Sequence, residues 1–174
     1  TYGNGMLLST GTSLANIKED STGMALVDNM STDAIDMTAH KELALGASQD
    51  AEYSGNIIVG TNQAYRFAAM NGATLTLNSS LASEHDVIVD GQGLSGGTVV
   101  LGGASAVNGT VTVMGHKDGR DGDVTLGFAA DDALSAAAAV HVEKGGIVDV
   151  GNTTQTLNVK DPVTETFQRP EDNV

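Results

Sequence analysis

Short segments in which apolar and polar residues alternate follow one another along the chain from about residue 55. Alternation with a period of two is the signal of a half-buried β-strand, because successive side chains of a strand point to opposite faces. The aliphatic pairs that carry this signal are Leu75/Leu77, Val87/Val89, Val99/Leu101, Val111/Val113, Val124/Leu126, Val140/Val142, Val148/Val150 and Leu157/Val159. The pattern predicts an all-β fold of many short strands.

Glycines separate these segments at a fixed interval. Gly91, Gly103, Gly115 and Gly127 recur every twelve residues, and Gly151 lies two such steps further on. A glycine at a constant offset after each strand predicts the same corner repeated, with positive φ or a close approach of two backbones. Repetition at a short period favours a stacked solenoid. An antiparallel β-sandwich is the alternative, because its strands are also separated by regularly spaced turns.

The repeats do not cover the two ends of the chain. We expect an N-terminal β-rich segment or cap over 1–54, β-helix (solenoid) repeats over 55–160, and a C-terminal cap or linker over 161–174, which holds both prolines. Within the first segment, 13–17, 23–27, 34–37 and 42–45 are candidate strands, and a helix opened by Thr32 is the competing interpretation. The alanine run 136–139 is expected to form a tight corner.

Composition excludes several classes of function. The chain of 174 residues has Lys+Arg 8 and Asp+Glu 22, a formal charge of −14, so we expect it to bind neither nucleic acid nor an anionic membrane. It has no Cys, which excludes disulfides and thiolate sites. No apolar run predicts a transmembrane segment. The chain begins at Thr1, and we expect it to be a processed or excised piece of a longer protein.

The densest carboxylate cluster is Asp118, Asp121 and Asp123, within the polar stretch 116–123. Calcium prefers several hard oxygen ligands around a turn that glycine permits, so these three residues are candidate Ca²⁺ ligands. The spacing does not match the EF-hand loop, and Lys117 and Arg120 partly neutralise the cluster. A solvated turn is the competing interpretation. No other cofactor is predicted.

Aromatic residues are few, and two of them share one face of a predicted strand. Tyr65 and Phe67 flank Arg66, which points to the other face. The favoured interpretation is that the two rings fill or cap the interior. The alternative is that they form a contact patch for a ligand such as a glycan or a protein.

Other polar groups suggest catalysis only weakly. Asp131–Asp132 are adjacent and predict a turn pair rather than the acid and base of a glycosidase. Ser79, Ser80 and Ser83 lie near Glu84–His85–Asp86, but His and Asp that are adjacent in sequence do not make the geometry of a triad. The four histidines share no ligand spacing and are expected at the surface: His40, His85, His116 and His141.

The order of these segments resembles the autotransporter-associated β-strand repeat of bacterial passenger domains. The elements that carry the resemblance are GGTVVLGGA (96–104), GTVTV (109–113), LGFAADDAL (126–134), VHVEKGGIVDVG (140–151) and QTL (155–157). Residues 52–93 are similar to upstream passenger modules. Two departures are Ala68–Ala69, where such modules often have two glycines, and the polar insertion 116–123.

The resemblance implies a right-handed parallel β-helix, secretion through a bacterial outer membrane, and a structural or adhesive role at the cell surface. It predicts no enzymatic activity, and as partners a host-surface glycan or protein, or other copies through stacked coils. A Ca²⁺- or glycan-binding module, or the stalk of a larger secreted hydrolase, is the alternative. With roughly 20 residues per coil, the chain is expected to form about eight coils spaced about 4.8 Å apart.

Overall fold

The computed structural model describes residues 6–8, 14–15, 17–27, 29–91, 96–115 and 123–159. All regular structure in this part of the chain is β-strand, so no described helix is available to cross a membrane. The strands are β1 (Met6–Leu8), β2 (Gly23–Leu26), β3 (Met30–Ser31), β4 (Ile35–Asp36), β5 (Leu43–Ala47), β6 (Ala51–Tyr53), β7 (Ile57–Ile58), β8 (Tyr65–Ala69), β9 (Thr74–Leu77), β10 (Val87–Asp90), β11 (Thr98–Leu101), β12 (Thr110–Met114), β13 (Val124–Phe128), β14 (Ala139–Val142), β15 (Gly146–Asp149) and β16 (Asn158–Val159).

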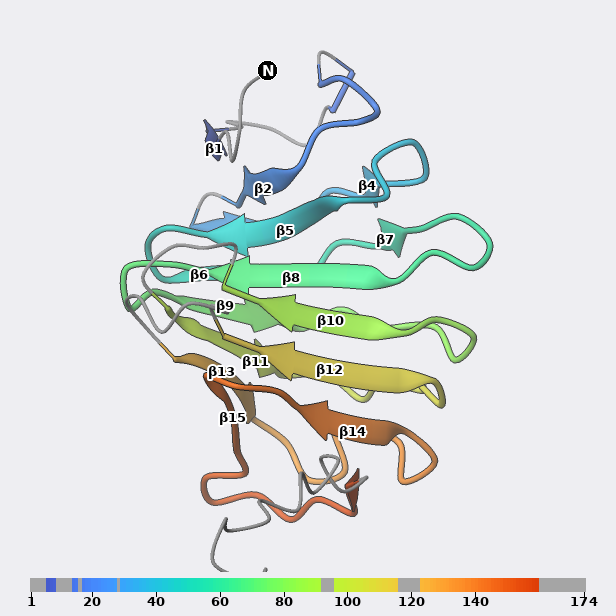
Figure 1. Ribbon diagram of the computed structural model, residues 1–174, viewed down its shortest axis with the longest axis vertical. Coiled ribbons are helices and arrows are strands. Elements are labelled where there is room, and N and C mark those ends of the chain that lie inside the picture. The colour runs from blue at the N-terminus through green and yellow to red at the C-terminus, as the bar shows by residue number, and fades with distance from the viewer. Residues whose placement is uncertain are drawn as a thin grey trace, which may run out of the picture.

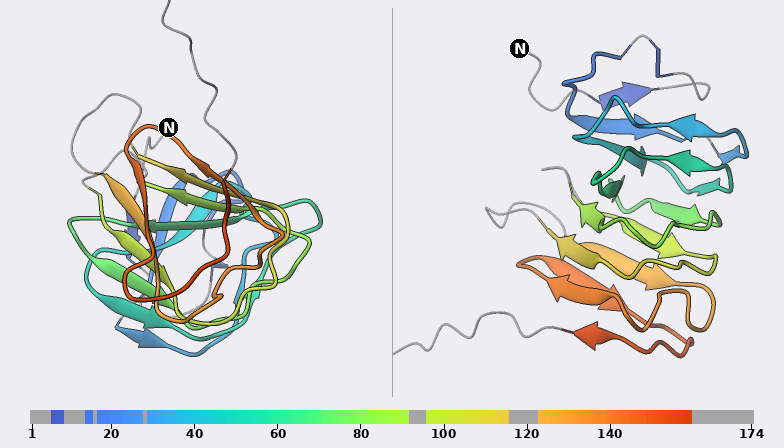
Figure 2. Two further views of the ribbon diagram at one scale, coloured as in Figure 1. Left: turned by 90° about the horizontal axis from the view of Figure 1, so that it is seen from below. Right: turned by 90° about the vertical axis from the view of Figure 1, so that its right-hand side faces the viewer.

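The strands stack as a right-handed parallel β-helix (Figures 1 and 2). Each coil adds one strand to an eight-stranded sheet A, β1-β2-β5-β8-β10-β12-β14-β16, and most coils add one to a six-stranded sheet B, β15-β13-β11-β9-β6-β3. Every strand pairing is parallel. The solenoid prediction is therefore confirmed, and the antiparallel sandwich is excluded.

The third side of the coil has little strand structure. Among the described residues, only β4 and β7 pair there, as a two-stranded sheet C, and later coils keep a single parallel bridge between Ser105 and Leu134. The view down the axis shows this side as connecting segments between sheets A and B (Figure 2).

Rows of aliphatic side chains fill the interior in register. In sheet A, Val87 pairs with Val111, which in turn pairs with Val140, and all three are at most 1% exposed. Sheet B contributes a facing row in which Leu75 pairs with Val99 and Val99 with Leu126, each 0% exposed. Removing these side chains from water is the main favourable term for a chain so poor in aromatic residues.

The coils between β5 and β14 are longer than the roughly 20 residues we expected. Leu45 pairs with Phe67 and Phe67 with Val89, which are steps of 22 residues, and Val113 pairs with Val142, a step of 29 residues. The chain consequently makes about six turns rather than about eight. The longest step contains the polar insertion 116–123, of which residues 116–122 lie outside the described part of the chain.

The twelve-residue glycine interval marks two alternating positions rather than one repeated corner. Gly91 and Gly115 follow strands of sheet A, Gly103 follows a strand of sheet B, and Gly127 lies inside β13. None of these four has positive φ, so that part of the prediction was wrong for them. Close approach does occur at Gly115, where a Cβ would overlap the backbone of Gly145.

Left-handed residues make the corners instead. Gly151 has φ +53°, as predicted, and Asn71 and Gly72 have φ +58° and +75°. The latter pair turns the chain from β8 in sheet A to β9 in sheet B, a geometry that Asn and Gly tolerate better than other residues. The alanine run 136–139 also forms a corner, with a turn at 136–137 directly before β14.

Sheet A continues through the segment that we separated as 1–54. β5 pairs with β8 across residue 54, and β2 pairs with β5. Strands were correctly predicted near 23–27, 34–37 and 42–45, and the helix opened by Thr32 does not form. The strand expected over 13–17 is wrong, because the described residues there, Leu14, Ala15 and Ile17, lie in irregular structure.

A second apolar cluster lies on the outer side of sheet A. Its members are Met24, Leu26, Ala44, Ala68 and Met70, each between 0% and 7% exposed. The cluster explains why β2 and β5 are buried at every position instead of alternating. Ala68 belongs to this outer cluster, whereas Ala69 belongs to the interior core. Both alanines are fully buried, and a Cβ on Gly97 would come within 2.8 Å of the Ala69 Cβ, which explains why both residues are small.

Candidate functional site

Tyr65 and Phe67, the candidate ligand-contact residues, point inward from β8. Their rings are stacked, with centroids 6.1 Å apart and an interplanar angle of 7°, and they are 3% and 1% exposed. Arg66, between them, points outward, where Nη2 lies 2.8 Å from Glu42 Oε2 and Nε donates to the Lys41 carbonyl at 3.0 Å. The rings therefore fill the interior, and this position leaves no ring face at the surface for the ligand contact considered above.

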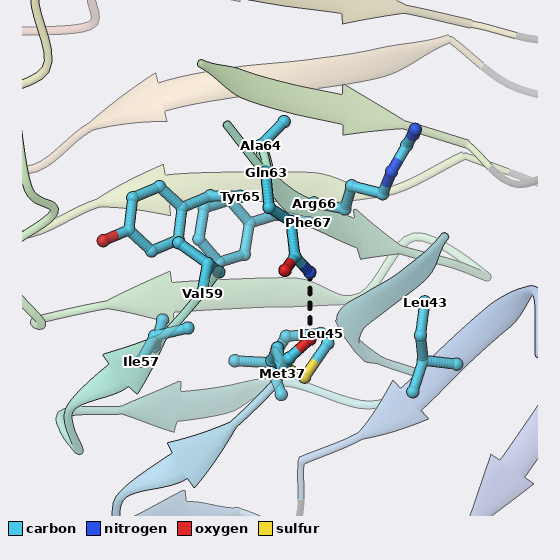
Figure 3. Close-up of a pocket in the computed structure, with 10 residues that line it drawn as sticks. All are labelled: Met37, Leu43, Leu45, Ile57, Val59, Gln63, Ala64, Tyr65, Arg66 and Phe67. Atoms are coloured by element: carbon cyan, nitrogen blue, oxygen red, sulfur yellow. Dashed lines mark hydrogen bonds between the residues drawn. The ribbon is translucent and has the colours of Figure 1, made fainter. Parts of the chain in front are cut away.

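A small cavity lies beside these rings, inside the coil (Figure 3). It forms where the aromatic rings of β8 meet aliphatic side chains from the preceding coil. Its free volume is about 10 Å³, which is about the space needed by one water molecule. A sugar or an organic cofactor does not fit there. The residues around it include Met37, Leu43, Leu45, Ile57, Val59, Gln63, Tyr65 and Phe67.

Gln63 is the buried polar residue of this cavity, at 7% exposure. Its Nε2 donates to the Met37 carbonyl at 2.9 Å and to the His40 carbonyl at 3.4 Å, and its Oε1 accepts from the Gly60 amide at 2.9 Å. The first contact is drawn as the dashed line in Figure 3. Because both the Nε2 and the Oε1 of the side-chain amide are hydrogen-bonded to the backbone, Gln63 links two coils and has a structural role.

In the Ser–His–Asp grouping at 79–86, the side chains bond to backbone groups of other segments. Ser79 Oγ donates to the Gly55 carbonyl at 2.6 Å, and Asp86 Oδ1 accepts from the Thr110 amide at 2.7 Å. His85 Nδ1 lies 2.9 Å from the Gln63 carbonyl, and its ring meets the edge of Tyr65 with centroids 5.3 Å apart. Each of these three groups bonds to a different part of the backbone, so Ser79, His85 and Asp86 are not hydrogen-bonded to one another as a triad.

Carboxylates at the corners hold consecutive coils together. Asp50 Oδ1 accepts from the Thr74 amide at 2.8 Å, Asp86 Oδ1 from the Thr110 amide at 2.7 Å, and Asp131 Oδ1 from the Thr154 amide at 2.7 Å. The two partners are 23 or 24 residues apart, which is about one coil. We call these three contacts the coil clamps. Sequence reasoning missed them because their spacing is meaningful only once the coil length is known.

Of the three candidate calcium ligands, only Asp123 lies in the described part of the chain, where it is exposed. Asp118 and Asp121 lie outside the described residues, so the calcium site stays a prediction. Among the residues that the structure describes, no group of three or more His, Asp or Glu side chains is placed to hold a metal ion. Asp131 and Asp132 lie in a turn, as expected, and Asp131 serves as a coil clamp.

The prediction of surface histidines was wrong for His40. Its side chain is 5% exposed, and its Nδ1 has no hydrogen-bond partner among the described residues. It lines an open groove of about 540 Å³ together with Ile17, Glu19 and Asp36. Hydrogen bonds from the Thr38 hydroxyl and amide hold the pKa of Asp36 below its usual value. The groove therefore has an acidic rim over apolar walls.

Comparison of this chain with protein-family models, with curated proteins and with solved structures gave no match. The functional argument consequently depends on the residues and on the geometry described above. The described geometry consists of an interior filled by side chains, corner carboxylates bonded to the backbone, and an open groove near His40.

Proposed function

We propose that this chain is a structural segment of a bacterial surface protein, a stiff rod that spaces or displays other parts of a secreted protein and contributes adhesive surface. The observation that carries the proposal is the unbroken register of the two sheets. From β2 to β14, each strand of sheet A is hydrogen-bonded to the strand of the next coil.

A register of this kind favours stiffness along the axis. Bending the rod would open backbone hydrogen bonds on one side and compress the packed rows on the other. The coil clamps add a charge-assisted hydrogen bond between neighbouring coils at three corners. These contacts need no disulfide and no metal, which suits a chain without Cys.

The charge of the chain supports a role as an exposed, soluble rod. With 22 acidic and 8 basic residues, copies of the chain repel one another, and this opposes pairing between exposed sheet edges. The same charge disfavours contact with other anionic surfaces. The resemblance of residues 101–159 to passenger repeats supports the surface location.

The location is tested by labelling intact cells with an antibody raised against the folded chain. We expect labelling of unpermeabilised bacteria and loss of the signal after brief treatment of the cells with an external protease. Signal that requires permeabilisation would contradict the proposal. An antibody against an abundant cytoplasmic protein serves as the control for cell integrity.

The role as a spacer is tested by replacing residues 23–159 in the parent protein with a Gly/Ser linker of equal residue number. A flexible Gly/Ser linker has no fixed end-to-end distance and lacks the stiffness of stacked coils. We expect loss of surface display or of adhesion despite normal expression. Unchanged adhesion and display would show that the folded rod is dispensable and would overturn the proposal.

A further inference from the structure

The sequence Asn-x-Ser/Thr occurs four times in the chain, in each case without proline in the middle position. The four sequons are Asn29-Met30-Ser31, Asn78-Ser79-Ser80, Asn108-Gly109-Thr110 and Asn152-Thr153-Thr154. This triplet is the acceptor pattern for asparagine-linked glycosylation, and its use requires that the asparagine be accessible on the folded surface.

The fold places all four sequon asparagines at the surface, although the chain has many buried positions. Asn29, Asn78, Asn108 and Asn152 are each exposed. Each lies in a corner next to a strand: Asn29 directly before β3, Asn78 directly after β9, Asn108 shortly before β12, and Asn152 shortly after β15. A corner presents its side chains away from the sheet, where an enzyme reaches them without opening a strand pairing.

The hydrogen-bonding groups of the sequons are also available. Toward the described residues, the four carboxamides form no side-chain hydrogen bond, and neither do the hydroxyls of Ser80 and Thr154. The middle hydroxyls differ, because Ser79 Oγ is bonded to the Gly55 carbonyl and Thr153 Oγ1 to the Val150 carbonyl. The hydroxyl that the acceptor pattern requires is thus free in both of these sequons, whereas the neighbouring hydroxyl is engaged.

Asn78 shows how the next coil accommodates an exposed carboxamide. The Asn78 side chain lies over Gly102 of the following coil, and a Cβ on Gly102 would overlap its Oδ1. Asn78 and Asn152 both follow a strand of sheet B, so they lie at the same corner of the coil in different layers. Groups attached there would project from the corner and leave the outer faces of sheets A and B uncovered.

We propose that these four asparagines are acceptor sites for asparagine-linked glycosylation, with a hexose activated as a nucleoside diphosphate as the donor. In the transfer, the carboxamide nitrogen forms a bond to the anomeric carbon of the hexose. The bond from that carbon to the diphosphate oxygen breaks, and the nucleoside diphosphate leaves with the electron pair. The nitrogen loses one proton to a base of the transferring enzyme, and no oxidation or reduction occurs. This inference goes beyond the structural role, since a surface rod needs no modification.

The first test is peptide mass spectrometry on the protein purified from the cells that naturally produce it. We expect hexose-containing mass additions on peptides that hold the sequon asparagines. Asn56 and Asn62 are the matched controls, because both are exposed but neither is followed by Ser or Thr two residues later. Unmodified peptides at all four sequons, or equal modification of the controls, would overturn the proposal.

The second test uses the purified unmodified chain with a soluble asparagine-specific glycosyltransferase and uridine diphosphate glucose. We expect the folded chain to gain hexose, and the single variants Asn78→Gln and Ser80→Ala each to lose one site, while Asn62→Gln loses none. Far-ultraviolet circular dichroism checks that each variant is folded. If only the denatured chain accepts hexose, the fold hides the sequons and the presentation argued here is wrong.

Discussion

Strands β13 and β15 are neighbours in sheet B with similar sequence alternation but different burial. The inward residue Leu126 of β13 is 0% exposed, whereas its register partner Val148 in β15 is only partly buried. Ile147, within β15, and Val150, directly after it, are 41% and 39% exposed. Alternation therefore predicts that a strand forms, but it does not predict how well the strand is buried.

The cause is the number of neighbouring coils. β13 lies between β11 and β15, while β15 is the last strand of sheet B and β16 the last of sheet A. An inward side chain in a solenoid is covered by its own layer and by the layers on both sides, so a terminal layer loses one of its covers. Residues of equal hydrophobicity should therefore contribute unequally to stability according to their coil.

The largest effect is expected from truncating a leucine in the central coils. Leu126→Ala should lower the free energy of unfolding by about 2–5 kcal/mol, because it leaves a cavity with packed rows above and below. Leu157→Ala removes the same atoms from a partly buried position beside the terminal coil and should cost about 1 kcal/mol or less. Urea unfolding followed by circular dichroism measures both variants. Equal losses would refute the dependence on coil position.

A glycine at a close approach should be the next most sensitive position. A Cβ on Gly55 would overlap the Asp33 backbone and lie 2.7 Å from the Tyr53 hydroxyl, so Gly55→Ala should cost about 1–3 kcal/mol. Gly127→Ala is the matched control, since its Cβ would meet Val100 Cγ2 at an ordinary 3.4 Å. We expect it to be neutral or slightly stabilising. A loss at Gly127 as large as at Gly55 would contradict the packing described here.

The coil clamps offer the same comparison with polar groups. Asp86→Ala removes the acceptor for the Thr110 amide in the central coils and should cost about 1 kcal/mol. Asp131→Ala removes the acceptor for the exposed Thr154 near the terminal coil, where water can replace the carboxylate, and should cost a few tenths of that. Thermal unfolding of the two variants tests this order, and the reverse order would show that the clamps act independently of their coil.

The last effect appears only at alkaline pH. Burial is the main cause that raises the pKa of Tyr53 from its ordinary value of 10.0 to about 12, and the nearby charge of Asp33 adds to the rise. The Tyr53 hydroxyl donates to the Asp33 carbonyl at 2.6 Å. Since the unfolded chain loses this proton at lower pH than the folded chain, the contribution is fully present below about pH 10 and is lost as pH rises toward 12.

Comparison of Tyr53→Phe with the unsubstituted chain isolates this contribution. The unsubstituted chain should lose more stability than the variant between about pH 9.5 and about pH 11.5. This range lies around and between the Tyr53 pKa values of the unfolded and the folded chain. Urea midpoints at several pH values measure the difference. Parallel pH profiles for the two proteins would show that Tyr53 does not titrate differently in the folded and unfolded chains.

The interior was largely predictable from sequence, whereas the corners were not. The pairs Val111/Val113 and Val124/Leu126 indicated inward rows, and the structure buries all four completely. The twelve-residue glycine interval corresponds to about half a coil and does not mark one repeated corner. The reason is that strands of sheets A and B alternate along the chain. The burial of His40 and the Asp86 clamp could not be predicted, since their partners lie on other segments of the chain.

The candidate site shows the same division. Tyr65 and Phe67 were recognised as a pair on one face, but only the fold showed that this face is the interior. The spacing of the Ser–His–Asp grouping argued against a triad, and the backbone carbonyls that engage Ser79 and His85 come from the preceding coil. The sequons could be read in the sequence, while their exposure could not.

The sequence by itself determined that the chain forms short strands with aliphatic rows on one side, because that information is local and periodic. It also determined the acidic charge and the absence of cysteine chemistry. Only the tertiary structure decided the coil length, the carboxylates that clamp one coil to the next, and the burial of each strand. Those properties depend on contacts between residues about one coil apart, and the spacing of such contacts varies with every corner.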